Sequence, residues 1–216
     1  MKVLHRVIGL FLAFLAAALL AGCGGRSDGP VRVSATDSGG FAGTRLDPSI
    51  PRPAFTLSDT AGRTFDFRTR TAGKVAVLFF GYTRCPDVCP TTMADLAAAR
   101  ALLPVEVRRR VDVVFVTEDP ASDTAPVLRR WLDQFDPTFV GLRGGTTATG
   151  AVLDQLKLPR TVIKEGVGGE SVEHSGVVYL FSPKDTTTVI HTGGTTAQQY
   201  AADLTRLAHD SSSLTG

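Results

Sequence analysis

The fold is decided by residues 80–90, which read FGYTRCPDVCP. The residues just before them, 74–80, are almost wholly apolar, the pattern of a strand that is buried on both faces of a sheet. Apolar residues then recur at helical spacing over about 89–103. Two cysteines, Cys85 and Cys89, therefore stand where a central strand runs into a helix.

The rest of the chain alternates strands and helices on both sides of this motif. Two short apolar runs around a turn signal predict a hairpin over residues 55–67. The other expected elements are a strand at 111–117, a helix from Asp123 or Thr124 to Phe135, a strand at 139–142, a helix at 148–156, strands at 176–181 and 187–191, and a helix at 196–209. This order predicts the α/β class, with a mixed central sheet flanked by helices. It is the order of a thioredoxin-like fold with an N-terminal β-hairpin extension.

The spacing of the two thiols bears on their chemistry. Thioredoxin-like oxidoreductases usually separate their cysteines by two residues, whereas three residues separate Cys85 from Cys89. At a helix start both sulfurs can point to one side, and the unpaired N–H groups and the helix dipole there favour thiolates. Such a pair either forms a disulfide or holds a soft metal such as Cu(I).

A Cu(II) ion would also want a nitrogen ligand, and three histidines are candidates. His209 lies near the carboxyl terminus and fits a solvated helix residue, and His191 ends a strand and fits a structural or surface role. His174 follows a glycine-rich segment, 158–173, that we expect to be a loop. In a thioredoxin-like fold that loop lies beside the cysteine helix. His174 is therefore the candidate nitrogen ligand.

The amino terminus has the features of a targeting signal. Lys2 and Arg6 precede an apolar run that is too short for a comfortable transmembrane helix. The run ends in LAGC at Cys23, which resembles the lipobox of bacterial lipoproteins. We therefore expect lipid on Cys23 and an extracytoplasmic protein anchored to the outer face of the bacterial cell membrane. The expected divisions are a signal peptide at 1–22, a flexible tether rich in Gly, Ser, Asp and Pro at 23–53, a thioredoxin-like domain at 54–210 and a disordered tail at 211–216.

The charge balance argues against nucleic acid as a partner. The 216 residues carry a formal net charge of +2, and Lys2 and Arg6 of the leader account for all of it. The chain without its leader is formally neutral, whereas proteins that bind nucleic acid present basic surfaces. A hydrophobic fraction of 43% with 20% charged residues fits a globular domain with a core.

Four motifs occur together in one known family. They are Gly81-Tyr82-Thr83 with Cys85-Pro86-Asp87-Val88-Cys89-Pro90, Phe115-Val116-Thr117-Glu118-Asp119-Pro120 with Asp123-Thr124, Phe135-Asp136-Pro137 with Gly141-Leu142, and His174-Ser175 before Val178-Tyr179-Leu180-Phe181. Over about residues 53–207 the sequence resembles the Sco/SenC proteins, which are copper chaperones for cytochrome c oxidase. The sequence departs from them at Glu118, where the family has an apolar residue.

The resemblance implies one copper ion, Cu(I) or Cu(II), held by Cys85, Cys89 and His174. It implies delivery to the cytochrome c oxidase subunit that carries the dinuclear copper centre, with an extracytoplasmic copper donor or a thiol reductant as a further partner. Asp119 either supports the ligands from the neighbouring strand or fixes the turn that follows it. Oxidation of the cysteine pair to a disulfide would block copper binding.

Other functions would use the same cysteines. The main alternative is a thiol–disulfide oxidoreductase acting on cysteines of the oxidase copper site or of other extracytoplasmic proteins. It would need no histidine, and the chain lacks a proline at the place before the third core strand where thioredoxin-type enzymes carry one. A peroxidase would need Thr or Ser three residues before its cysteine, which neither cysteine has, and structural zinc would need a fourth ligand. A chaperone turns over no substrate, so we do not expect an enzyme.

Overall fold

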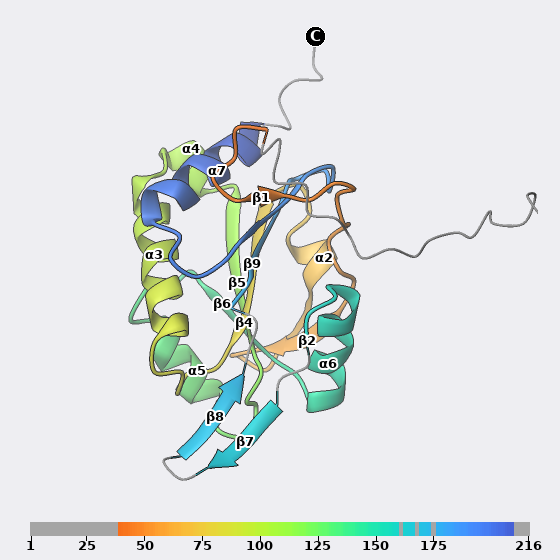
Figure 1. Ribbon diagram of the computed structural model, residues 1–216, viewed down its shortest axis with the longest axis vertical. Helices are drawn as coiled ribbons and strands as arrows, with labels where there is room; N and C mark the ends of the chain where they lie inside the picture. Colours follow the sequence, from red (N-terminus) through yellow and green to blue (C-terminus); the bar gives the residue numbers. More distant parts are fainter. Residues whose placement is uncertain (1–38, 160–161, 167–168, 174–175, 210–216) are drawn as a thin grey trace, which may run out of the picture. The chain divides into compact units, whose positions relative to one another are not determined.

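The computed structural model describes residues 39–209 apart from 160–161, 167–168 and 174–175. It contains an eight-stranded mixed sheet in the order β1-β10-β9-β4-β5-β6-β2-β3 (Figure 1). The strands are β1 (Thr44–Arg45), β2 (Thr56–Asp59), β3 (Thr64–Asp66), β4 (Val75–Gly81), β5 (Val111–Thr117), β6 (Val140–Arg143), β9 (Val178–Phe181) and β10 (Thr188–His191). A separate hairpin pairs β7 (Val162–Gly166) with β8 (Gly169–Glu173). The helices are α2 (Phe67–Arg70), α3 (Val88–Leu102), α4 (Val105–Arg108), α5 (Ala125–Leu132), α6 (Thr146–Gln155) and α7 (Ala197–His209).

β4 lies inside the sheet, and every residue of it is buried. It runs parallel to β5 and antiparallel to β9. Because side chains alternate along a strand, β4 contributes to two cores. Val77 and Phe79 pack with side chains of α3, α5 and α7, and Leu78 and Phe80 pack on the opposite face with side chains of α2 and α6. Figure 1 shows these two helical layers on either side of the sheet.

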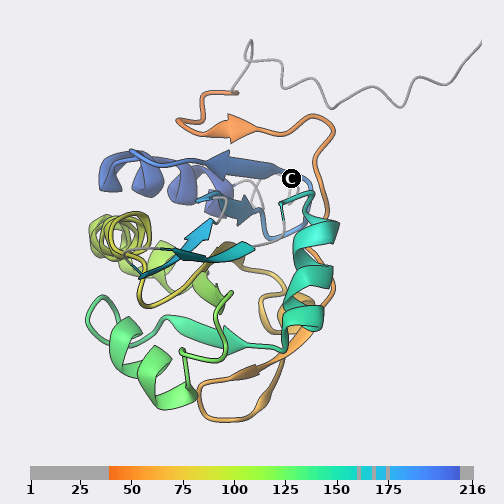
Figure 2. The ribbon, with the colours of Figure 1, turned by 60° about the horizontal axis from the view of Figure 1, so that its bottom comes forward.

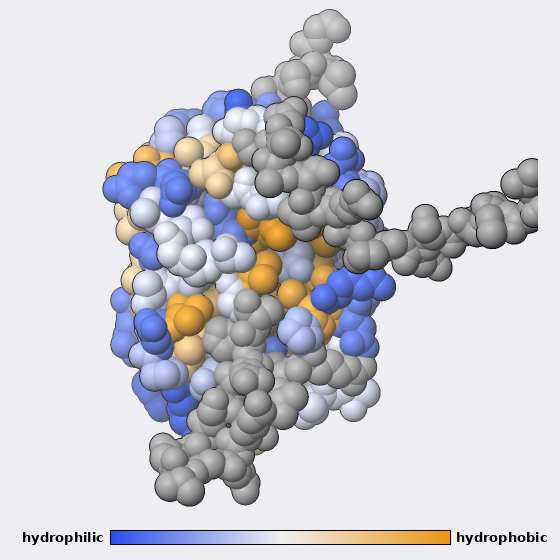
Figure 3. All heavy atoms as spheres, viewed as in Figure 1, coloured by the Kyte–Doolittle hydropathy of each residue, from blue (hydrophilic) through white to orange (hydrophobic). Residues whose placement is uncertain are grey.

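The two edges of the sheet are formed by segments from the beginning of the described chain. Figure 2 shows β1 at one edge and the β2–β3 hairpin at the other. The hairpin joins the sheet through β6, where Ser58 pairs with Arg143 and Asp59 with Leu142. In Figure 3 hydrophobic side chains reach the surface over the strands in the middle of the face, between helices with more polar surfaces. No helix among the described residues is long and apolar enough to cross a membrane.

The predicted α/β class, mixed central sheet and N-terminal hairpin are confirmed. The strand predicted at residues 111–117 is β5 with the same bounds, and the other expected strands and helices are present with ends that differ by a few residues. The short helices α2 and α4 have no counterpart among the expected elements. The segment 158–173, expected to be a loop, contains the β7–β8 hairpin.

The expected tether, residues 23–53, does not extend over residues 44–53. Thr44–Arg45 forms β1 and pairs with β10, and Arg52 exposes only 1% of its surface. A sheet edge can bind a strand through backbone groups alone, so β1 needs no apolar pattern. In the sequence, a buried arginine likewise cannot be distinguished from a polar residue of an exposed loop.

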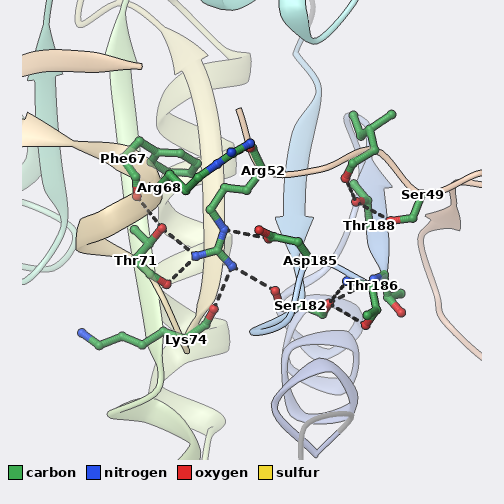
Figure 4. Close-up of polar contacts among 12 residues, drawn as sticks. Ser49, Arg52, Phe67, Arg68, Thr71, Lys74, Ser182, Asp185, Thr186 and Thr188 are labelled. Carbon is green, nitrogen blue, oxygen red and sulfur yellow. Dashed lines mark hydrogen bonds and ion pairs between the residues drawn. The ribbon is translucent and has the colours of Figure 1, made fainter. Parts of the chain in front are cut away.

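The side chain of Arg52 fixes this segment to the domain (Figure 4). Its guanidinium donates to the carbonyl oxygens of Lys74 at 3.1 Å and Ser182 at 2.9 Å, and it pairs with Asp185 at 3.0 Å. It also donates to the hydroxyl of Thr71 at 2.7 Å and to the carbonyl oxygen of the same residue. Burial lowers the pKa of Arg52, while Asp185 acts to raise it. A buried cation is tolerated only with such partners, so this network ties the segment before β2 to residues beside β4 and β9.

Candidate metal centre

Cys85 and Cys89 lie beyond the carboxyl end of β4, where the chain enters α3. Both are free thiols, and both are buried, with 8% and 0% of their surfaces exposed. The backbone N–H of Cys89 donates to the sulfur of Cys85 at 3.3 Å, and the two side chains are hydrogen-bonded to each other. The structure therefore brings together the two sulfurs that the sequence places one helical turn apart.

Gly81, the last residue of β4, makes room for the sulfur of Cys89. A Cβ atom at this position would lie 2.5 Å from Cys89 Sγ and 3.2 Å from the ring of Phe115. The backbone N–H of Glu118 donates to the carbonyl oxygen of Gly81 at 2.8 Å, which holds this backbone against the end of β5. Glycine is required here because a sulfur packs against its Cα. The sequence signal for this role is a glycine that ends an otherwise fully apolar strand.

Burial raises the pKa of Cys89 well above its ordinary value. The side chain of Cys85 and the charge of Glu118 act in the same direction, and a hydrogen bond with the backbone of Tyr82 acts against them. The helix start is expected to favour thiolates, and burial opposes this effect at Cys89. A helix dipole is a small effect beside the removal of a charged sulfur from water. Burial therefore favours the protonated, neutral form of Cys89.

Asp119 follows β5 and contacts the cysteine motif from the neighbouring strand. It exposes 3% of its surface, and Arg84 of the motif donates to it at 2.8 Å. It also accepts the backbone N–H of Ser122 at 3.2 Å, which fixes the turn. Burial acts to raise the pKa of Asp119, but hydrogen bonds from Arg84 and Ser122 outweigh it and lower the pKa. Asp119 is therefore an ionised anchor for both the motif and the turn.

Asp123 also binds the motif, a role that the sequence interpretation missed. It is fully buried and accepts the backbone N–H of Thr83 at 3.0 Å and its hydroxyl at 2.5 Å. The hydroxyl of Thr117 donates to it at 2.6 Å. The N-cap of α5 is Thr124 rather than Asp123. The available signal was a second acidic residue four positions after Asp119 in the loop that leaves β5.

His191 and His209 differ in burial and in their contacts. His191 exposes 3% of its surface, and its Nε2 lies 2.9 Å from Asp203 Oδ2. Asp203 also accepts the backbone N–H groups of Ala42 and Gly43, each at 2.9 Å. His191 therefore pairs β10 with Asp203 of α7, and Asp203 in turn holds the segment before β1. His209 is exposed at the end of α7.

Two predicted site residues, His174 and Cys23, lie outside the described residues. The chain after His174 is described again from Gly176, where a Cβ atom would lie 3.5 Å from Val88 Cγ1. Val178 then pairs with Phe79 of β4. Among the described residues no three His, Cys, Asp or Glu side chains are grouped so that they could hold a metal ion.

The comparisons with known proteins agree with this architecture. Protein SenC of Rhodobacter capsulatus is 35% identical over 130 residues, which are 60% of this chain and 58% of that protein. The matched part of the chain covers between 34% and 64% of the length of the first four curated relatives.

Solved structures match over most of the described domain. The structure of Bradyrhizobium japonicum ScoI with copper bound has a TM-score of 0.64 and 28% identity, covering 74% of this chain and 99% of that one. Apo Sco1 from Thermus thermophilus has a TM-score of 0.67 and 32% identity, covering 77% of this chain and 96% of that one. These neighbours confirm the predicted thioredoxin-like fold. The sequence model described as SCO1/SenC matches residues 44–209, more than half of the chain, and the protein therefore belongs to the SCO1/SenC family.

Proposed function

We propose that this protein is a copper chaperone that holds one copper ion through Cys85, Cys89 and His174 and delivers it to the copper centre of cytochrome c oxidase. The observation that carries the proposal is the contact between two buried, free cysteine side chains at the junction of β4 and α3. Two sulfurs held side by side are the soft donor set that suits Cu(I). Copper is bound in the structure of the related ScoI of Bradyrhizobium japonicum, which supports copper as the cargo here.

The chain that follows His174 supports this residue as the third ligand. Gly176 lies beside Val88, the first residue of α3 and the neighbour of Cys89. An imidazole supplies the nitrogen donor that Cu(II) favours.

The raised pKa of Cys89 makes copper loading an exchange of protons for metal. Cysteine binds a metal as a thiolate, so each thiol gives up its proton when copper binds. The apolar surroundings that disfavour a bare thiolate at Cys89 disfavour a copper-bound sulfur less, because the metal compensates its charge. Copper affinity should therefore rise with pH.

The sequence supports a proposal for the location, and membership of the family supports one for the partners. We place the domain outside the cytoplasm, anchored to the outer face of the membrane by lipid on Cys23. The recipient is the oxidase subunit with the dinuclear copper centre, and a copper donor or thiol reductant acts on the same side of the membrane. The solved structure of BsSco, a member of the Sco family of cytochrome c oxidase assembly proteins, shares the fold at a TM-score of 0.56.

Metal titration of the reduced full-length protein tests the three-ligand site. Wild-type protein should bind one Cu(II) with a sulfur-to-copper charge-transfer band. His174→Ala should weaken binding and change that band, and His209→Ala, which removes an exposed histidine at the end of α7, should leave both unchanged. The same affinity and the same spectrum in His174→Ala and wild type would end the three-ligand proposal.

A thiol–disulfide oxidoreductase is the second candidate, favoured by the same contact between the two cysteine side chains. In that reaction Cys85 and Cys89 would lose two protons and two electrons to form a disulfide, while a disulfide of the partner would gain them and become two thiols. The raised pKa of Cys89 opposes it as the attacking thiol, so Cys85 would attack first. High insulin-reductase turnover that survives His174→Ala would favour this candidate over the chaperone.

A further inference from the structure

A polar pocket lies beside the cysteine end of α3, on the side of that helix that faces α7. Its volume is about 150 Å³, and it is open to solvent at the surface. One wall is the first two turns of α3, and the other is the segment 192–195 between β10 and α7. In Figure 3 the surface over this segment is pale, which is the colour of the intermediate hydropathy of threonine and glycine. Val88 lines the pocket and is the neighbour of Cys89 in the chain.

The side chains that line the pocket carry negative charge only. Asp87 and Asp95 line it, and its lining residues include no lysine or arginine. Asp87 is the N-cap residue of α3, yet its side chain makes no capping hydrogen bond. Within the described part of the chain neither carboxylate makes an ion pair. The two acids are eight residues apart, about two helical turns, so they lie on one face of the helix.

Buried hydroxyl groups supply hydrogen-bonding capacity inside the pocket. Thr92 exposes 7% of its surface and lines the pocket, and its hydroxyl makes no hydrogen bond among the described residues. Tyr200 exposes 2% and forms the floor with a hydroxyl that is hydrogen-bonded to Thr195. Asp95 faces this phenol closely enough to act on its pKa in the same direction as burial, which raises it. The hydroxyl of Thr92 therefore offers the pocket a hydrogen-bonding group that no described residue uses.

We propose that this pocket receives the cationic end of a lysine or arginine side chain from a protein that docks over the cysteine end of α3. A group with several N–H donors can bind the two carboxylates and the hydroxyl of Thr92 at once. A metal ion fits less well, because no group of three metal-ligating side chains occurs among the described residues. Because the pocket lies beside Cys89, we identify the docking partner as the protein that exchanges copper or electrons with Cys85 and Cys89. This identification rests on the proposed function. The pocket itself does not depend on copper.

The test uses the full-length, reduced, copper-free protein labelled with nitrogen-15. It is titrated with methylguanidinium and methylammonium, which stand for the ends of arginine and lysine, and with methylurea, a neutral molecule of similar shape. The backbone amides of Gly194 and Thr195 report on the pocket. At least one of the two cations should shift these two amide resonances in a saturable way, and the cation that binds more tightly identifies the side chain. Methylurea should give none.

Two variants separate the pocket from general surface charge. Asp95→Asn and Asp87→Asn should each weaken cation binding by roughly threefold, the range of a partly exposed ion pair. Glu106→Gln, which removes an exposed acid on α4, should leave it unchanged. Equal shifts with methylurea, no saturable shift with either cation, or binding to both variants as tight as to wild type would overturn the proposal. Because copper is absent, none of these outcomes bears on the copper site.

Discussion

Replacing Gly81 by alanine should push the sulfur of Cys89 out of its position. The added Cβ would lie 2.5 Å from Cys89 Sγ, whereas ordinary contact begins at 3.4 Å, so the sulfur must move by about 0.9 Å. The other neighbour, Phe115, is fully buried and packs against the rings of Phe79 and Trp131, so it cannot give way. Overpacking of this kind costs about 1–3 kcal/mol. At about 2 kcal/mol the thermal midpoint should fall by about 4–8 °C.

A double-mutant cycle shows whether the sulfur is the cause. In a Cys89→Ala background the added methyl meets no sulfur, so Gly81→Ala should cost about 1 kcal/mol less there than in wild type. Gly145→Ala is the control, because a Cβ at that position meets nothing within 4 Å, and it should cost less than about 1 kcal/mol. The assay is thermal and urea unfolding of the copper-free protein. Equal costs of Gly81→Ala in the two backgrounds would refute the argument.

Three further outcomes are expected. Arg52→Ala should destabilise the protein by about 3 kcal/mol or more in urea unfolding, because the buried carbonyl oxygens and the carboxylate that the guanidinium binds would lose their donor. The control is Arg45→Ala at the exposed edge strand, which should cost less than about 0.5 kcal/mol. Burial acts to raise the pKa of Asp203, but the hydrogen bonds that Asp203 accepts lower it below the value in the unfolded chain. Ionised Asp203 therefore stabilises the fold above the unfolded pKa, and this stabilisation is lost as the pH falls through the lower folded pKa. Asp203→Asn should flatten the fall in thermal midpoint below about pH 4, and an unchanged profile would contradict this. Glu118→Gln should lower the pKa of Cys89 while leaving it above its ordinary value, since burial is the larger cause. The pH dependence of alkylation of Cys89 measures this in a background that carries Cys23→Ser and Cys85→Ser.

The parts of the fold that could be predicted are those with a strong apolar pattern. The strands β4 and β5 are buried on both faces, so nearly every residue in them is apolar and their position is plain in the sequence. β1 has only two residues, Thr44 and Arg45, and is held by backbone pairing with β10, which leaves no side-chain pattern. The segments 162–166 and 169–173 are rich in charged residues and glycine, so they resemble a loop in the sequence.

The position of the cysteine pair was predictable from the sequence, but the electrostatics around the pair were not. The spacing of Cys85 and Cys89 suffices to put both sulfurs at one helix end. Whether Cys89 is a thiol or a thiolate depends on burial, which arises from β4, β5 and α3 packing together and is invisible in a local motif. The same holds for Asp123, whose partner Thr83 lies 40 residues away in the chain.

The most direct test of the account is X-ray absorption spectroscopy of the copper-loaded full-length protein at the copper edge. Wild-type protein should show two sulfur atoms and one imidazole around a single copper. His174→Ala should lose the imidazole scattering and keep both sulfurs, and His191→Ala should keep all three. Imidazole scattering that persists in His174→Ala, or a copper site with fewer than two sulfurs in wild type, would contradict the account.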